Sequence, residues 1–246
     1  MSDASTHNPL EQFAIKQIMP LELFGYDISI TNASATMLLV TFSILVLFSR
    51  VKNNVTGVPS KMHIFCENAY NFVSKIVLEN TGSDGKTFIP LVFSLLLFII
   101  FSNLFGLIPY GFTVTSHLIV TLILALIVFF TIIISGFKFR GMKFLEIFVP
   151  SGMPSWLRPL MAIIELFAFL ARPVSLSLRL AANMVAGHVL LKVIAGFIVI
   201  MPIYGKIFPF ALVIVLIGFE FFVAILQAYI FAVLSSVYLS DSVQGH

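Results

Sequence analysis

The chain has 246 residues, of which 59% are hydrophobic and 10% are charged, and its mean hydropathy is +1.07. Soluble domains carry about 25% charged residues. The 14 Lys and Arg and 11 Asp and Glu residues of this chain cannot cover the surface of a soluble protein of this length, so the composition predicts a membrane protein. The single cysteine, Cys66, excludes an intramolecular disulfide and a thiolate metal site, and the net charge of +3 gives no reason to expect a nucleic-acid partner.

Residues 1–32 form a polar N-terminal segment without a continuous apolar run, so we expect neither a secretory signal nor an Arg-rich transit peptide there. Residues 33–50 are apolar up to Arg50 and predict a first membrane helix. In residues 59–80, apolar side chains recur at helical spacing while polar ones form a stripe at every fourth residue. This pattern predicts a helix lying on the membrane surface, with a solvated connector helix as the alternative.

Residues 88–136 contain two apolar runs joined by a short turn without Lys or Arg, which predicts a membrane hairpin. The connector that follows, up to Arg158, is basic and rich in glycine and proline. Residues 155–240 contain two apolar helices that would be roughly 60 and 50 Å long, against a hydrocarbon core of about 30 Å. They must lean across the membrane as an antiparallel pair or break, and Pro173 is one place for a bend.

These elements predict an all-α integral membrane protein in a single membrane domain. It has about five membrane helices, one interfacial amphipathic helix and a long tilted C-terminal helical hairpin. The basic residues lie at 50–61 and 136–158, and the turn at 108–115 has none, so we expect the N-terminus outside and the C-terminus inside.

Charged residues within membrane helices are functional candidates, because each costs at least about 2.5–3.5 kcal/mol to insert. Arg158, Glu165, Arg172 and Arg179 follow one another at intervals of seven and share one face of a helix. Anchoring at a helix end explains Arg158 and Arg172 equally well. Arg179 lies deep in the apolar helix and cannot lose its proton, so it needs a carboxylate or water. Glu165 is too distant along the helix, and a carboxylate of another subunit would serve better.

Asn183, one turn beyond Arg179, continues the polar face, whereas His188 falls on the opposite side of an ideal helix. The last helix carries Glu220 and, seven residues later, Gln227. Antiparallel packing would bring His188 near Glu220, and such a pair can pass a proton. A structural hydrogen bond that seals two helices is the alternative, but it leaves Arg179 unexplained.

No cluster of His, Cys and acidic residues predicts a metal site, and no nucleophile lies beside a base. We therefore expect no cofactor and no catalytic activity of the chain itself.

Several stretches resemble the a subunit of the F-type ATP synthase, also called the ATPase subunit 6 family. The most specific is RPVSLSLRLAANMVAGH at 172–188. Supporting matches are NPLEQF at 8–13, NLFGLIPY at 103–110, TSH at 115–117, VPSG at 149–152, and Glu220 followed by LQAYIFAVLSSVYL at 226–239.

The resemblance implies a stator subunit of the membrane proton channel, in which two offset half-channels carry protons to and from the carboxylates of a rotating ring of c subunits. Arg179 matches the arginine that draws the proton off each ring carboxylate. Asn183, His188, Glu220 and Gln227 match the outer half-channel, and Glu165 matches the inner one. The implied partners are the c-subunit ring, the peripheral-stalk b subunits, the remaining subunits of the F0F1 complex and the lipid bilayer.

Some family members carry Glu and His in the reverse order at positions 188 and 220, so this chain is similar to the mitochondrial and related bacterial branch. We expect a bacterial inner membrane, with the mitochondrial inner membrane as the alternative, and protons rather than sodium as the ion. An ion-coupled secondary transporter is the rival function, although such proteins usually show two related halves and interrupted helices, which this sequence lacks.

Overall fold

The computed structural model describes residues 13–20, 22–23, 26–27, 29–49, 51, 60–108, 111–148 and 156–244. Several parts of the predicted elements lie outside this range. They are the first twelve residues with most of the NPLEQF stretch, Arg50 and residues 52–59, the turn residues 109–110, and the connector residues 149–155 with the VPSG stretch.

The described chain is almost entirely helical, which confirms the predicted all-α membrane fold. Five helical stretches within it are long and apolar enough to cross a membrane: Asn32–Ser49, Lys61–Leu107, Leu118–Leu145, Arg158–Ile200 and Ile203–Val243. The α-helices are α1 (Asn32–Ser49), α2 (Lys61–Thr81), α3 (Ile89–Leu107), α4 (Leu118–Arg140), α5 (Arg158–Ile200) and α6 (Ile207–Gln244). Short 3-10 helices connect them: η2 (Gly82–Phe88), η3 (Val114–Ser116), η4 (Gly141–Phe148) and η5 (Ile203–Gly205).

The N-terminal segment contains two small antiparallel strand pairs that the sequence did not predict. β1 (Gln17–Met19) pairs with β4 (Ile30–Thr31), and β2 (Glu22–Leu23) pairs with β3 (Tyr26–Asp27). Asn32 ties this segment to the start of α1, because its side chain accepts from the backbone N–H of Lys16 and donates to the carbonyl of Ala14. Strands of two or three residues are too short to show a period of two in the sequence.

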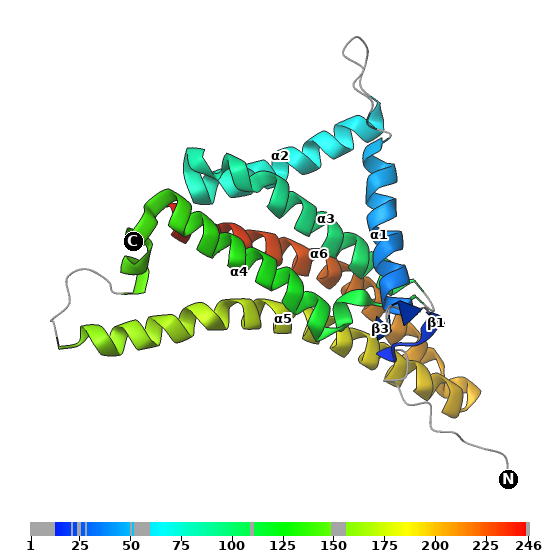
Figure 1. The fold of residues 1–246 in the computed structure, drawn as a ribbon. Helices are drawn as coiled ribbons and strands as arrows, with labels where there is room; N and C mark the ends of the chain where they lie inside the picture. Colours follow the sequence, from blue (N-terminus) through cyan, green and yellow to red (C-terminus); the bar gives the residue numbers. More distant parts are fainter. Residues whose placement is uncertain are drawn as a thin grey trace.

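Helix α2 leads from the far end of α1 to the beginning of α3 and lies at a steep angle to α1 (Figure 1). The Ser60 side chain caps its start by accepting from the backbone N–H of His63. Val73 and Val77 are fully buried on its inner side, whereas Phe65 and Phe72 are exposed. A helix with one buried side that crosses the direction of its neighbour is the geometry expected for an interfacial helix.

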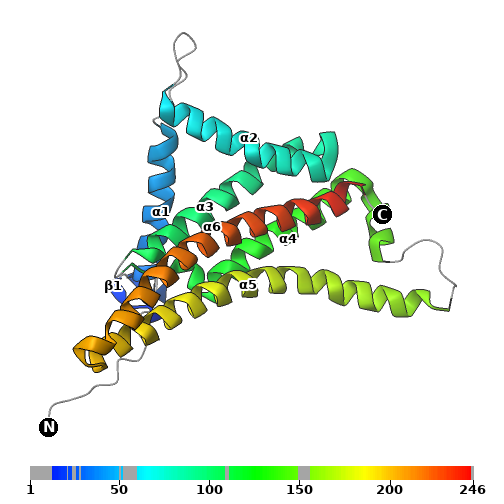
Figure 2. The same cartoon turned by 180° about the vertical axis from the view of Figure 1, so that it is seen from behind.

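Helices α5 and α6 are joined by the short connection around η5 and run back along one another (Figure 2). With 43 and 38 residues, they are about 64 and 57 Å long at 1.5 Å per residue. Neither can stand upright in a hydrocarbon core of about 30 Å, so both must tilt strongly. Pro173 is buried inside α5, which stays continuous there and curves along its length (Figure 2).

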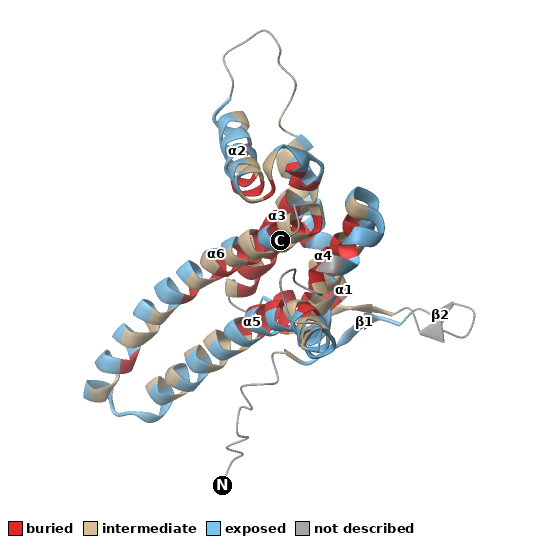
Figure 3. Cartoon of the chain, turned by 90° about the vertical axis from the view of Figure 1, so that its left-hand side faces the viewer, coloured by how far each residue is buried: buried red, intermediate tan, exposed pale blue. Residues whose placement is uncertain are grey.

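Helix α6 is the central element, since α2, α3, α4 and α5 all pack against it. A stripe of small residues makes this possible, because small side chains let helix backbones approach closely. The buried members of the stripe are Ala224, Ala228, Ala232 and Ser236. Buried residues gather where the helices meet, whereas the far end of the α5–α6 hairpin is exposed and apolar (Figure 3).

Candidate functional site

A histidine of α5 and a glutamate of α6 face one another between the two long helices. Nδ1 of His188 lies 3.4 Å from Oε1 of Glu220. The Glu220 residue is only 5% exposed, and neither carboxyl oxygen makes a hydrogen bond to a described residue. Gly187 permits this approach, because a Cβ at that position would lie 2.8 Å from Oε1 of Glu220. An imidazole and a carboxyl group at this separation can exchange a proton after a shift of roughly half an ångström.

The other ring nitrogen of His188 is also engaged. Nε2 lies 2.9 Å from the hydroxyl oxygen of Thr113, in the connection between α3 and α4. Phe13 packs edge-on against the imidazole, with ring centroids 6.3 Å apart. Three other parts of the chain therefore contact this ring: α6, the connection between α3 and α4, and the N-terminal segment. Thr113 was not among the sequence candidates, and no sequence signal marks a threonine in a connection as a neighbour of a residue 75 positions away.

An amide pair continues the polar contact along the two helices. Asn183 of α5 donates through Nδ2 to Oε1 of Gln227 on α6, at 2.9 Å. Asn183 is exposed on the surface of α5, whereas Gln227 is 2% exposed. The pair thus links the exposed surface of α5 to a buried position of α6, about two turns from Glu220. Amide groups can hold water, and they can donate as well as accept hydrogen bonds.

Asn103 of α3 joins three elements at the same level. Its Nδ2 donates to the carbonyl of Ala224 on α6 at 2.9 Å, and its Oδ1 accepts from the hydroxyl of Thr115 at 2.7 Å. Asn103 and Thr115 are completely buried. Asn103 therefore bridges α3, α6 and the connection between α3 and α4.

Arg179 lies on the exposed side of α5, beside the buried Leu180. Within the described part of the chain, no hydrogen bond or ion pair involves this guanidinium. Glu165, the carboxylate of this chain that was considered as a partner of Arg179, lies near Arg172 instead. A cation at this depth needs an anionic or aqueous partner, and the exposed side of α5 is where one would have to approach.

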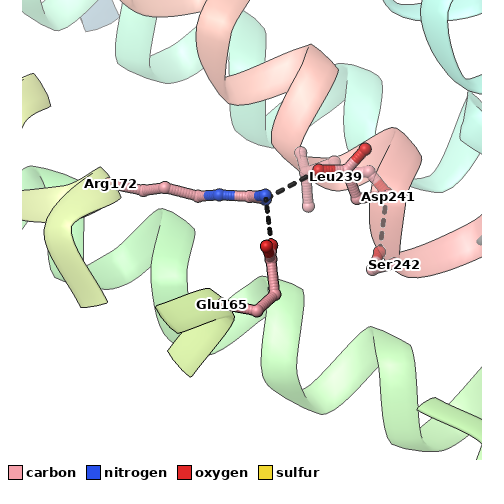
Figure 4. A network of polar contacts seen from close by, with 5 residues as sticks. All are labelled: Glu165, Arg172, Leu239, Asp241 and Ser242. Carbon is pink, nitrogen blue, oxygen red and sulfur yellow. Dashed lines mark hydrogen bonds and ion pairs between the residues drawn. The ribbon is translucent and has the colours of Figure 1, made fainter. Parts of the chain in front are cut away.

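Three charged residues meet near the other end of the hairpin (Figure 4). Nη1 of Arg172 donates to Oδ2 of Asp241 at 2.6 Å, and its Nη2 lies 3.7 Å from Oε1 of Glu165. The guanidinium also lies over the rings of Phe169 and Tyr238, at 5.5 and 5.1 Å from their centroids. Two carboxylates around one cation leave a net charge of −1 in this cluster.

In this cluster the Arg172 side chain is 19% exposed and lies between two acidic side chains. Asp241 was missed because the last helix was expected to end at residue 240, whereas α6 continues to Gln244. An acidic residue directly after a predicted membrane helix was the signal that could have identified it.

His117 lies directly before α4, in the connection that follows α3. Its ring stacks on Phe112 with centroids 5.0 Å apart, and its buried Nε2 has no hydrogen-bond partner among the described residues. Burial lowers the pKa of His117, which precedes α4. No three His, Cys, Asp or Glu residues in the described range are grouped so that they could hold a metal ion.

The two polar clusters are offset along α5. From Arg172 to His188 the distance is roughly 24 Å at 1.5 Å per residue, and Arg179 lies between them, roughly 10 Å from Arg172. The arrangement provides a titratable group pair on either side of one exposed cation. Protons could therefore move through the groups on either side of Arg179, while its positive charge opposes a direct path between them.

In a comparison with known protein families, the chain matches the model described as ATP synthase A chain over residues 33–240. The matched range includes all but the first residue of α1, the whole of α2 to α5 and most of α6. Of the polar residues of the site described above, Asp241 alone lies outside it.

Proposed function

Because the chain belongs to the ATP synthase A chain family, the proton-translocating and non-catalytic a subunit of the membrane sector, we propose that its two polar clusters form the two half-channels. The family assignment also decides against the secondary transporter. The chain is a multi-pass protein of an energy-coupling membrane and a member of the F0F1 complex. The residue roles and the individual neighbours below are our proposal.

The observation that carries the proposal is the position of Arg179. It is exposed on α5, unpaired among the described residues, and located along α5 between the cluster of Glu165 and Arg172 and the pair of His188 and Glu220. We propose that the carboxylates of a c-subunit ring pass this surface and pair with Arg179 one at a time. In this complex the peripheral-stalk b subunits are the other expected membrane neighbours, as the family resemblance implies.

In the outer half-channel, a proton reaches the ring through His188, Glu220, Asn183 and Gln227. In the transfer step, the N–H bond of a protonated imidazole breaks as the O–H bond of the Glu220 carboxyl group forms. The amide pair then leads from the interior to the exposed surface of α5, near Arg179. On the inner side, Glu165 receives the proton released from the ring.

Arg179 performs two tasks in this scheme. Its fixed charge favours the ionised form of an arriving carboxyl group, which drives release of the proton. The same charge opposes a proton that would cross directly between the clusters. The ion pair must stay reversible, because a permanent pair would stop rotation. We propose that water held by the amide groups of Asn183 and Gln227 keeps the pair reversible.

The test uses the purified complex in liposomes under an imposed pH gradient and membrane potential. Arg179→Ala should abolish proton-driven ATP synthesis while the subunits still assemble. Arg158→Ala is the matched control, because it removes the same exposed side chain from the first residue of the same helix. Normal proton-driven synthesis in the assembled Arg179→Ala complex would refute the proposal.

A further inference from the structure

The hydroxyl group of Thr113 is the partner of His188 that the proposed proton path does not yet use. Thr113 is 4% exposed and lies in extended conformation just before η3, with φ −86° and ψ 100°. Its Oγ1 is 2.9 Å from Nε2 of His188, while Nδ1 of the same ring faces Glu220. The imidazole is thus held at one nitrogen and directed at the carboxyl group with the other.

Two contacts hold Thr113 in this place. Its carbonyl accepts hydrogen bonds from the backbone N–H and the hydroxyl of Ser116, at 3.2 and 2.6 Å. Its side chain packs directly on Gly106 of α3, where a Cβ would lie 2.5 Å from Oγ1. The hydroxyl position is therefore determined by the backbone of the connection and by the absence of a side chain at Gly106.

The same connection is tied to the helix that carries Glu220. Thr115, two residues after Thr113, donates to Asn103, and Asn103 donates to the carbonyl of Ala224. Ala224 lies one helical turn from Glu220 on α6. The buried hydrogen bonds of Asn103 therefore connect the segment that contains Thr113 to α6, the helix that carries Glu220.

A hydroxyl group suits both protonation states of an imidazole. When both nitrogens are protonated, the hydroxyl oxygen accepts from Nε2–H. After Nδ1 has passed its proton to Glu220, the neutral ring keeps Nε2–H, so the hydroxyl oxygen still accepts from it. A partner that only donates would have no such hydrogen bond in either state. The contact therefore survives the gain and loss of a proton by His188.

We propose that Thr113 is a positioning residue of the proton path, whose hydroxyl group holds the imidazole of His188 with Nδ1 toward Glu220 in both protonation states. This inference rests on the proposed function of His188 and Glu220. Without the hydroxyl, the ring can rotate about its side-chain bonds, and the fraction of time in which Nδ1 faces the carboxyl group falls.

The experiment measures passive proton flux and proton-driven ATP synthesis of the purified complex in liposomes, with assembly checked for each variant. Thr113→Val removes the hydroxyl at nearly constant volume, and the extended backbone accommodates valine. We expect a roughly threefold to tenfold loss of flux, which corresponds to one lost hydrogen bond. Thr113→Ser keeps the hydroxyl and should restore most of the flux.

Thr121→Val is the matched control. Thr121 is fully buried, and its hydroxyl donates only within its own helix, to the carbonyl of Leu118 at 3.1 Å. This variant should retain normal flux, so a general effect of replacing a buried threonine is separated from the loss of the contact with His188. Gly106→Ala tests the same contact independently, because the added methyl group displaces the Thr113 hydroxyl, and it should also slow flux.

His188→Ala in the same assay separates the two levels of the proposal. If His188→Ala slows flux and Thr113→Val does not, the positioning role of Thr113 is refuted while the proposed path stands. If His188→Ala leaves flux unchanged, the proposed path fails and the role of Thr113 fails with it. Should Thr113→Val and Thr113→Ala both fail to assemble while Thr113→Ser assembles, Thr113 is a structural residue and the inference is wrong.

Discussion

Gly187 offers the sharpest test of the contact between α5 and α6, since a single methyl group can be directed at the Glu220 carboxyl group. In Gly187→Ala, the new Cβ would lie 2.8 Å from Oε1 and 3.2 Å from Cδ of Glu220. The distance to Oε1 is shorter than a Cβ atom permits and the distance to Cδ is tight, so the carboxyl group must shift away from α5. Its partner His188 is the next residue of α5 and does not move with it.

The size of the effect follows from these distances. Ordinary contact begins near 3.4 Å, so Oε1 must withdraw by roughly 0.6 Å, and its separation from Nδ1 of His188 increases from 3.4 Å. A misplacement of about 1 Å can cost about 100-fold in rate, so we expect proton flux to fall by about tenfold or more. Alanine is also the better helix former by about 1 kcal/mol, so loss of the helix cannot explain a slow variant.

The assay is proton-driven ATP synthesis by the assembled complex in liposomes, with passive proton flux measured alongside. Gly196→Ala and Gly218→Ala are matched controls on α5 and α6, because a Cβ at either position meets nothing within 4 Å. Both controls should retain normal rates. Wild-type flux in Gly187→Ala would show that proton transfer does not depend on the approach of Glu220 to α5, and our account of the outer cluster would be wrong.

Two further predictions concern the individual clusters. Glu220→Gln keeps the shape of the buried side chain but cannot carry a proton, so passive proton flux should fall by at least about tenfold while assembly is retained. The control is Glu79→Gln, which changes an exposed glutamate of α2. Equal flux in the two variants would contradict the role of Glu220. Arg172→Gln leaves the partly buried Asp241 without its partner at 2.6 Å. Because both side chains are about one-fifth exposed, the loss should fall between the values for surface and buried pairs, about 1–3 kcal/mol. This loss of stability is measured as a lower midpoint temperature of thermal disassembly. The comparison is Lys75→Gln, which removes one partner of the exposed pair of Lys75 and Glu79. A midpoint that falls no more in Arg172→Gln than in Lys75→Gln would mean that the cluster adds nothing to stability.

The membrane fold follows largely from the sequence because lipid imposes simple requirements. Apolar runs must be helical to satisfy their backbone groups, and runs much longer than the membrane thickness must tilt. The predicted fold class and its approximate number of membrane helices are confirmed on this basis. The N-terminal strand pairs were not predicted, because their two or three residues have no detectable period.

Part of the candidate site could be selected from the sequence. Contacts between segments that are distant in the sequence could not be predicted. Arg179, His188 and Glu220 could be selected because charged or titratable residues within apolar helices are costly and therefore stand out. Thr113 could not, since threonine is common in connections and only the packing of η3 against α5 brings it to His188. The roles of these residues stay predictions until the variants are measured.

The sequence by itself determined that the chain spans the membrane through long helices and that several polar groups lie at lipid depth. Helical period and hydropathy are local properties, so they can be read along the chain. Only the tertiary structure decided which polar groups meet: Arg172 with Asp241, Asn103 with Ala224, and His188 with Thr113. Such pairs depend on how far α6 extends, how closely its small residues let α3 and α5 approach, and where the connections run.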